Sequence, residues 1–158
     1  MQNPFLNLPK TWLNLEQRMK KIIYFIAALT LSNYAQAKPA FTGTDLSGVY
    51  DCTGEDAHEG KYKGTVTLTL RPAQSTGQFA AYHFKLDAQG FGVYQGEAAA
   101  NGNHVAIHFA LNDAKSNDAG TGIATFKKTA AGKQSFHKFY YESAYKGGNY
   151  GFEDCLQR

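Results

Sequence analysis

The sequence is poor in the residues that build specialised reactive sites. Its 158 residues include two cysteines, two methionines, four prolines and one tryptophan. The two cysteines lack the close C-x-x-C spacing of a redox or metal pair. No G-x-S-x-G nucleophile elbow or G-x-x-x-x-G-K-[ST] phosphate loop occurs, and the glycines of "GFGVYQG" follow a strand pattern and open no helix. The sequence therefore predicts no catalytic nucleophile, nucleotide site or cofactor.

Long hydrophobic runs are also absent. The longest apolar stretch, residues 22–31, is about half the roughly 20 residues that a membrane-spanning helix needs. The basic segment 19–21 ("MKK") precedes it, and the small-x-small segment 35–37 ("AQA") follows it. This order predicts a signal peptide over residues 19–37, cleaved near Ala37. We therefore expect a periplasmic or secreted protein with no integral membrane anchor.

Residues 38–158, which remain after the predicted signal peptide and the residues before it are removed, also lack net charge. Residues 1–18 precede the complete signal, so we expect them to be an upstream mis-start and translation to begin at Met19. Residues 1–37 contain four of the sixteen basic and one of the thirteen acidic residues, which leaves twelve of each sign in residues 38–158. A neutral chain has no electrostatic footprint for nucleic acid or an anionic membrane. We expect residues 38–158 to form a single domain.

The two cysteines lie near the two ends of the expected mature chain, at Cys52 and Cys155. Export would place them in an oxidising compartment, where a disulfide is the usual state of such a pair. Closing a loop of about 100 residues would restrict the unfolded chain by roughly 4 to 5 kcal/mol in the chain-entropy model. We therefore predict a structural disulfide between Cys52 and Cys155.

Helical periodicity is absent from residues 38–158, and short strand-like runs take its place. Eight runs rich in β-branched and aromatic residues are separated by clusters of Gly, Asn, Asp and Pro, about every 8 to 12 residues. They are "SGVYDCT", "KYKGTVTLTL", "QFAAYHFKL", "GVYQGEAA", "HVAIHFAL", "GIATFKK", "SFHKFYYE" and "NYGFEDCL". Val66, Leu68 and Leu70 share one face of the second run, which predicts a half-buried strand.

The connections indicate how these runs assemble. Asn101-Gly102 in "AANGNH" predicts a type I′ hairpin, which needs positive φ at both central residues. Eight antiparallel runs joined by short turns hide their edges by closing or by folding into a sandwich. A disulfide from the first run to the last favours closure, because those strands are neighbours in a closed meander. We predict an all-β fold: a single small antiparallel up-and-down β-barrel of about eight strands, closed by one disulfide.

Two short stretches carry resemblances to known families. The opening "LSGVYDCTG" resembles the Gly-x-aromatic start of lipocalin- and avidin-type barrels, and Tyr50 stands where those families usually carry tryptophan. A Y-x-C first strand with a second cysteine near the end of the chain resembles the periplasmic C-type lysozyme inhibitors. The first resemblance implies a barrel that carries a small ligand, and the second implies a protein that binds a lysozyme. Neither assigns a site residue.

Tyrosine is abundant in residues 38–158, which contain eight. A dry core favours Phe, Leu and Ile, which have no polar atom to satisfy, so this excess indicates a polar-tipped cavity or a recognition surface. Ordinary cross-strand packing, with the hydroxyls at the rims, is the alternative. The predicted ligand or partner site at a barrel mouth comprises Tyr50, Tyr82, Tyr94, Tyr141, Tyr145, Lys146 and Tyr150.

The segment "SAYKGGNYG" joins the last two runs. Gly147 and Gly148 adopt positive φ at little cost, and tyrosines flank Lys146. Lys146 and the neighbouring backbone amides could hold a small anion, and a plain hairpin turn is the alternative.

These patterns predict an exported, non-enzymatic binding protein that recognises a small ligand or a protein partner through a tyrosine-rich barrel mouth. A periplasmic protein of the lysozyme-inhibitor kind is one alternative. The other is a small β-barrel enzyme that pairs a carboxylate with a histidine. Its candidate carboxylates are Glu55, Asp56, Glu59 and Glu97.

Two polar patterns resemble metal sites but have the wrong spacing. His104 and His108 on one strand would lie roughly 13 Å apart, too far to share one zinc ion. Asp113 and Asp118 lie in a loop that does not match the twelve-residue calcium loop. We predict no metal site.

One alternation leaves two possibilities open. If Tyr150, Phe152 and Leu156 face inward, then Cys155 faces outward, and the same rule places Tyr50 on the face of Cys52. Either Tyr50 lies outside the barrel or a bulge intervenes.

Overall fold

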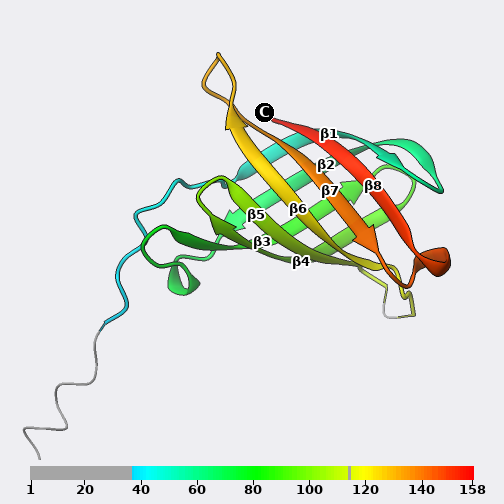
Figure 1. Ribbon diagram of the computed structural model, residues 1–158, viewed down its shortest axis with the longest axis horizontal. Coiled ribbons are helices and arrows are strands. Elements are labelled where there is room, and N and C mark those ends of the chain that lie inside the picture. Colours follow the sequence, from blue (N-terminus) through cyan, green and yellow to red (C-terminus); the bar gives the residue numbers. More distant parts are fainter. Residues whose placement is uncertain (1–36, 114) are drawn as a thin grey trace, which may run out of the picture. The chain divides into compact units, whose positions relative to one another are not determined.

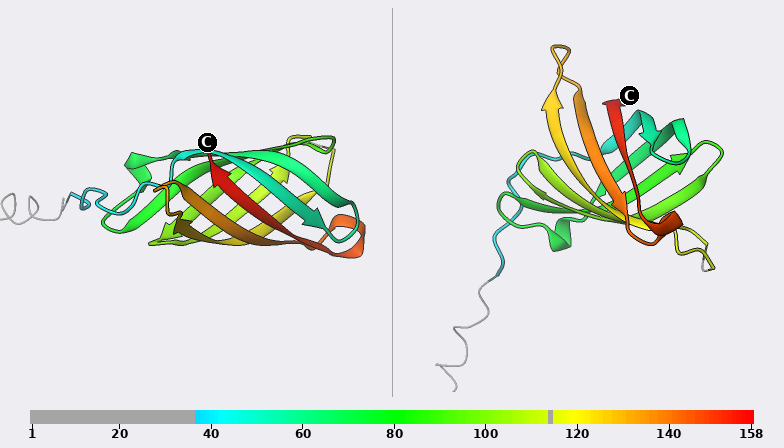
Figure 2. Two further views of the ribbon diagram at one scale, coloured as in Figure 1. Left: turned by 90° about the horizontal axis from the view of Figure 1, so that it is seen from above. Right: turned by 45° about the vertical axis from the view of Figure 1, so that its right-hand side comes forward.

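Eight antiparallel strands close into one barrel in the computed structural model, which describes residues 37–113 and 115–158 (Figures 1 and 2). Each strand pairs with its neighbours in sequence, and β1 pairs with β8 to close the ring. The strands are β1 (Gly48–Asp56), β2 (Gly60–Leu70), β3 (Phe79–Ala88), β4 (Gly92–Asn101), β5 (His104–Leu111), β6 (Ala119–Lys128), β7 (Gln134–Glu142) and β8 (Asn149–Gln157). Two short 3₁₀ turns, η1 (Pro72–Gln74) and η2 (Tyr145–Gly147), lie in connections. The predicted fold class is confirmed.

The disulfide lies at the closing seam of the barrel. Cys52 of β1 and Cys155 of β8 are direct partners in the strand register, and their sulfurs are 2.01 Å apart. Both side chains are buried. The predicted disulfide is therefore confirmed. The predicted mis-start and, apart from Ala37, the predicted signal peptide lie outside the described residues.

The last strand has the opposite orientation to the one considered from sequence, so neither an outward Tyr50 nor a bulge is needed. Tyr50, Cys52 and Cys155 all face inward, whereas Tyr150 and Phe152 are exposed on the outer wall. The interior beside β8 is already filled by tyrosines from other strands. A Cβ on Gly151 would lie 2.3 Å from the Tyr140 hydroxyl, so the barrel needs a glycine there.

The hairpin between β4 and β5 differs from the predicted turn. Asn101 is the last residue of β4 and pairs with His104, so the two turn residues are Gly102 and Asn103. Gly102 has φ of +62°, and Asn101 is not in the positive-φ region. The type I′ prediction is wrong, because the second central residue, Asn103, does not have positive φ, and positive φ at the first central residue alone is typical of a type II′ turn.

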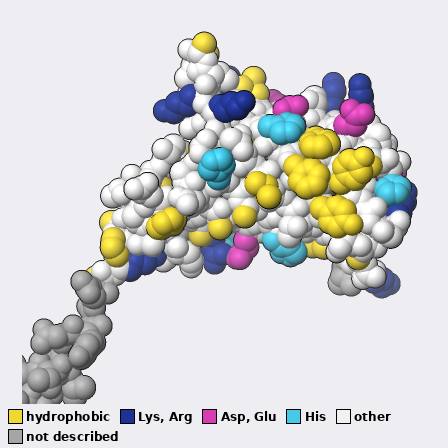
Figure 3. All heavy atoms as spheres, viewed as in Figure 1, with side chains coloured by type: hydrophobic (Ala, Val, Ile, Leu, Met, Phe, Trp, Pro, Cys, Tyr) yellow, Lys and Arg dark blue, Asp and Glu magenta, His cyan; other side chains and the backbone are white. Residues whose placement is uncertain are grey.

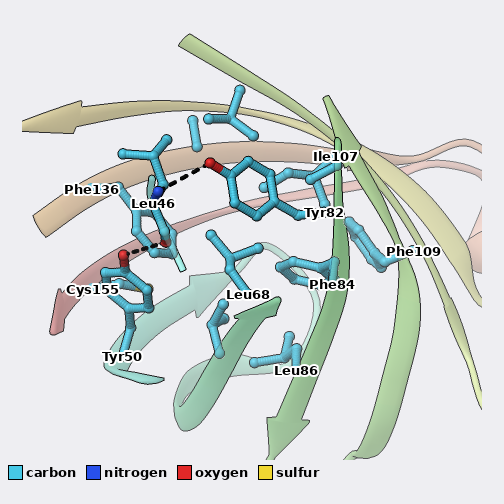
Figure 4. Packing of buried hydrophobic residues seen from close by; sticks show 14 of the residues in the cluster. Leu46, Tyr50, Leu68, Tyr82, Phe84, Leu86, Ile107, Phe109, Phe136 and Cys155 are labelled. Carbon is cyan, nitrogen blue, oxygen red and sulfur yellow. Dashed lines mark hydrogen bonds between the residues drawn. The ribbon is translucent and has the colours of Figure 1, made fainter. Parts of the chain in front are cut away.

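One end of the barrel is closed by apolar packing, and we call it the closed end. Leu46, which precedes β1, covers it and is 2% exposed. The Tyr50 hydroxyl donates to the Leu46 carbonyl (2.7 Å), and the Leu46 N–H donates to the Tyr82 hydroxyl (3.0 Å; Figure 4). The Tyr50 ring packs edge-on against Phe136, with centroids 5.2 Å apart. The hydroxyls of both tyrosines thus form hydrogen bonds with the backbone of Leu46.

Candidate functional site

The opposite end of the barrel contains a cavity of about 320 Å³, which we call the mouth cavity. Its walls come from strand ends and from the connections β1–β2, β3–β4, β5–β6 and β7–β8. Its carboxylates are Asp56, Glu59, Asp118, Glu142 and Glu153, and its aromatic rings are Tyr62, Phe91, Tyr94, Phe109, Tyr140 and Tyr145. A larger depression of about 670 Å³ lies over the β1–β8 seam, but it borders exposed side chains such as Arg158. Unlike this depression, the mouth cavity brings buried charges together with aromatic walls.

A fully buried ion pair lies at the deep end of the mouth cavity. Lys138 Nζ is 2.7 Å from Glu153 Oε2, and both side chains are 0% exposed. Neither atom has an aligned hydrogen-bond partner, so the contact is an ion pair without hydrogen-bond geometry. The ammonium lies 5.0 Å from the ring centroid of Phe109 and 5.2 Å from that of Tyr140, close enough for cation–π attraction. Aromatic faces thus offset part of the cost of removing this cation from water.

Tyr62 completes the surroundings of Glu153. Its hydroxyl donates to Glu153 Oε1 at 2.5 Å. Burial raises the pKa of this phenol, and the Glu153 charge raises it further, so it remains a donor. The ring needs a glycine beneath it, because a Cβ on Gly54 would lie 2.2 Å from the ring.

Asn149 connects three groups at the rim of the cavity and is 1% exposed. Its Nδ2 donates to Asp56 Oδ2 (2.7 Å) and to Glu142 Oε2 (2.6 Å). Its Oδ1 lies 2.9 Å from His58 Nδ1. Since both amide protons are used, Oδ1 acts as the acceptor and the His58 proton lies on Nδ1. Asn149 therefore fixes two carboxylates and one histidine tautomer.

The two carboxylates that share Asn149 have opposite pKa shifts. Burial raises the pKa of Glu142 to about 7, and the charges of Asp118 and Asp56 contribute, against the hydrogen bond from Asn149. Burial also acts to raise the pKa of Asp56, but hydrogen bonds from the Glu59 amide, the Tyr140 hydroxyl and other donors outweigh it and hold that pKa below its usual value. At neutral pH Asp56 is ionised and Glu142 is partly protonated.

Asp118 approaches the cavity from the β5–β6 connection. The Tyr94 hydroxyl donates to its Oδ2 at 2.8 Å. Its Oδ1 is buried and has no hydrogen-bond partner among the described residues. Burial raises the pKa of Tyr94, and this bond to Asp118 raises it further. A hydrogen bond with Asp118 also favours the protonated form of Glu142 and helps to raise the pKa of Glu142.

The outer rim of the cavity is held by Glu59. Its Oε1 accepts hydrogen bonds from the Tyr145 hydroxyl (2.8 Å) and from Lys146 Nζ. The hydrogen bond from Lys146 holds the pKa of Glu59 below its usual value. Lys146 has φ of +47°, and Gly147 and Gly148 also have positive φ. The cation that was expected to hold a small anion is thus paired with a carboxylate.

The seven predicted site residues lie in three places. Tyr94 and Tyr145 line the mouth cavity, and Lys146 lies at its rim through Glu59. Tyr50 and Tyr82 are buried at the closed end. Tyr141 and Tyr150 are exposed on the outer wall, 47% and 51%. The structure therefore does not bring the seven together, and whether each contacts a ligand or partner remains a prediction.

The outer wall of β6, β7 and β8 carries an apolar patch (Figure 3). Its residues, each 40–65% exposed, are Ile123, Phe139, Tyr141, Tyr150 and Phe152. They are adjacent, because Phe139 pairs with both Ile123 and Phe152, and Tyr141 pairs with Tyr150. Soluble monomers rarely expose a contiguous patch of this kind beyond a few hundred Å². We call this set the wall patch.

The carboxylate–histidine pairs considered for an enzyme do not form in the mouth cavity. Asp56 and Glu59 line it, but no histidine of the described chain does. Glu55 and Glu97 are exposed on the outer wall. Among described residues, the only group with metal-site spacing is Cys52, Glu153 and Cys155, and its cysteines form the disulfide.

Sequence reasoning missed the interior residues Lys138, Glu142, Asn149 and Glu153. The alternation of inward and outward residues along the last strand could have identified two of them. Once Cys155 faces inward to reach Cys52, alternation also turns Glu153 and Asn149 inward. A charged residue at an inward position marks either a buried pair or a site.

Comparisons with protein families, with curated proteins and with solved structures found no match. No helix in the described part of the chain is long and apolar enough to cross a membrane.

Proposed function

We propose that this chain is an exported binding protein that holds a small ligand in the mouth cavity. The observation that carries the proposal is the cavity itself, a space of about 320 Å³ inside one end of the barrel, walled by aromatic rings and convergent polar groups. Ligand sites in proteins typically have volumes of roughly 300 to 1,000 Å³ and combine apolar walls with a few placed polar groups.

The contrast with the closed end supports a binding role. A barrel of eight strands is filled by its own side chains when nothing needs to enter, as the closed end is. At the other end, buried charges border a space that the side chains leave open. Buried charges destabilise a fold unless they are well paired, so their presence beside an open space is typical of a functional site.

Export is the second part of the proposal. The basic, apolar and small-residue order of residues 19–37 supports it, and so does the Cys52–Cys155 disulfide, a bond typical of oxidising compartments. Expression of the full chain in a bacterium with a periplasm tests it. N-terminal sequencing of the periplasmic product should begin at Lys38, and a product that stays in the cytoplasm with its leader would contradict export.

Ligand binding is tested by native mass spectrometry of the full chain after mild purification. We expect an added mass that is lost on unfolding. A substitution that fills the cavity, Ala88→Phe, should abolish the added mass, whereas Ala106→Phe on the outer wall should keep it, because Ala88 lines the cavity and Ala106 is exposed outside it. Retention of the mass by Ala88→Phe would place the ligand elsewhere.

The wall patch favours a second candidate function, recognition of a protein partner. The closed barrel has no free strand edge, so a partner would bind through side chains. Exposed aromatics on adjacent strands are typical of the central part of protein interfaces. With c-type lysozyme as the probe, Phe139→Ser and Phe152→Ser together should abolish binding while Ala88→Phe leaves it intact. The opposite pattern would exclude the patch.

A further inference from the structure

The carboxylates of the mouth cavity outnumber its cations. Lys138 is paired with Glu153, and Lys146 is paired with Glu59. No lysine or arginine of the described residues forms an ion pair with Asp56, Asp118 or Glu142. These three side chains all line the cavity. The cavity therefore carries negative charge that no lysine or arginine of residues 37–113 and 115–158 neutralises through an ion pair.

We propose that the mouth cavity binds a small primary amine that carries a hydroxyl or carbonyl oxygen at its other end. This inference rests on the proposed ligand-binding function and names its ligand class. The ammonium would meet Asp56, Asp118 and Glu142, and the aromatic rings of Tyr94 and Phe91 line the same cavity. Asp118 would accept one of its hydrogen bonds through Oδ1, the oxygen to which Tyr94 does not donate.

The second half of the ligand is inferred from Lys138. Its side chain is 0% exposed, its Nζ borders the same cavity, and it donates no aligned hydrogen bond. Glu153 Oε2 forms an ion pair with this ammonium at 2.7 Å but is not aligned to accept a hydrogen bond, and a buried ammonium whose three N–H groups lack aligned acceptors costs free energy. A ligand oxygen at the deep end would supply that acceptor. Lys138 is therefore an observation independent of the acidic rim, and it also points to a ligand.

An amine fits this geometry better than a metal ion or an anion. Asp56, Asp118 and Glu142 do not bring their oxygens within the 4.8 Å mutual spacing that would allow one ion to be held by all three. An anion would face three carboxylates with both local lysines already paired. An ammonium donates up to three hydrogen bonds over a wider span and is also attracted to aromatic faces.

Isothermal titration of the full chain at pH 7.5 with three matched probes tests the proposal. Tyramine carries both an ammonium and a hydroxyl, 4-ethylphenol lacks the ammonium, and phenethylamine lacks the hydroxyl. We expect tyramine to bind, 4-ethylphenol to bind at least about 10-fold more weakly, and phenethylamine to be several-fold weaker than tyramine. Equal affinity of tyramine and 4-ethylphenol would overturn the amine but leave ligand binding in the cavity standing. Equal affinity of tyramine and phenethylamine would overturn the role of Lys138.

One substitution with a matched control localises the binding. Asp118→Asn keeps the shape of the side chain and removes its charge, so tyramine affinity should fall about 10-fold. Asp113→Asn removes a carboxylate from the same loop outside the cavity lining and should leave the affinity unchanged. Equal affinity for both variants would overturn the proposal. Failure of all three probes to bind would overturn the ligand class, whereas the proposed function would fail only if native mass spectrometry also showed no added mass.

Discussion

The two ends of the barrel use the same residue type, tyrosine, in opposite ways. At the closed end the hydroxyls of Tyr50 and Tyr82 bond to the backbone around Leu46. At the mouth, four tyrosine hydroxyls each donate to a carboxylate: Tyr62 to Glu153, Tyr94 to Asp118, Tyr140 to Asp56 and Tyr145 to Glu59. At the closed end the tyrosine hydroxyls are satisfied by backbone groups, and side chains fill the interior. The mouth uses its tyrosine hydroxyls to hold charges in place.

If the mouth cavity holds a ligand as proposed, this difference separates stability from binding within one short fold. The closed end resembles an ordinary core, where aromatic rings pack edge-on and few polar atoms remain. The mouth resembles a preorganised site, where each carboxylate is oriented before any ligand arrives. Preorganisation lowers the cost of binding but leaves charges close together in the unbound protein. We expect substitutions at the mouth to change both stability and binding, and substitutions at the closed end to change stability alone.

The largest expected effect is at the deep end of the mouth. Lys138→Met leaves Glu153 buried without its cation, so we expect a loss of about 3 to 5 kcal/mol in the free energy of unfolding. The double variant Lys138→Met, Glu153→Gln should recover most of this loss, because the amide oxygen still accepts from Tyr62 and neither position carries a charge. Urea unfolding measures both. A single variant as unstable as the double, or a loss below about 1 kcal/mol, would contradict the ion-pair account.

The second effect concerns the seam that joins the two ends. Replacing both Cys52 and Cys155 by Ala should cost about 2 to 5 kcal/mol, since the disulfide spans 103 residues and restricts the unfolded chain. Hydrogen exchange should show that β1 and β8 lose protection along their whole length. Loss of protection confined to the strand ends at the mouth would show that the two ends of the barrel unfold separately.

The fold was predictable from sequence to a greater extent than the site. Alternating runs, short turns and a cysteine in the first and last runs together favour a closed antiparallel barrel over a sandwich, and β1 to β8 follow those runs closely. The site depends on which residues face inward. Composition favours placing Phe152 inside and Glu153 outside, yet the structure does the reverse, because Lys138 opposite supplies a buried counter-charge. The disulfide to Cys52 turns Cys155 inward, and alternation along β8 then turns Glu153 inward as well, but its counter-charge Lys138 lies on another strand and cannot be identified from β8 alone.

A matched pair of smaller changes compares the ends directly. Tyr50→Phe removes the donor to the Leu46 carbonyl, and Tyr140→Phe removes one donor to Asp56. Each should cost about 1 to 2 kcal/mol in urea unfolding, because each leaves a buried acceptor with one fewer hydrogen bond. Only Tyr140→Phe should weaken tyramine binding, since it alone alters a cavity carboxylate. Weaker binding by Tyr50→Phe would show that the ends are coupled.

The smallest expected effect depends on pH and concerns Glu142. Its pKa is raised to about 7 from an ordinary value of 4.5, so the folded protein holds this proton more tightly than the unfolded chain does. The resulting stabilisation is fully present below pH 4.5 and is lost as pH rises through 7. The groups that face this carboxyl, Asp56, Asp118 and Asn149, remain in Glu142→Gln, which carries no charge and keeps an oxygen acceptor for Asn149.

Glu142→Gln should therefore match the wild-type protein at pH 4 and exceed its stability by about 1 kcal/mol at pH 8. The expected gain is smaller than the free energy equivalent to the whole pKa shift of Glu142, because water entering the cavity screens the carboxylate. Urea unfolding across that range measures the difference, and Glu55→Gln on the exposed wall is the control, whose curve should run parallel to the wild-type curve. If the gain at pH 8 is absent, Glu142 is ionised at little cost. The mouth would then differ from the closed end in shape but not in stored charge repulsion.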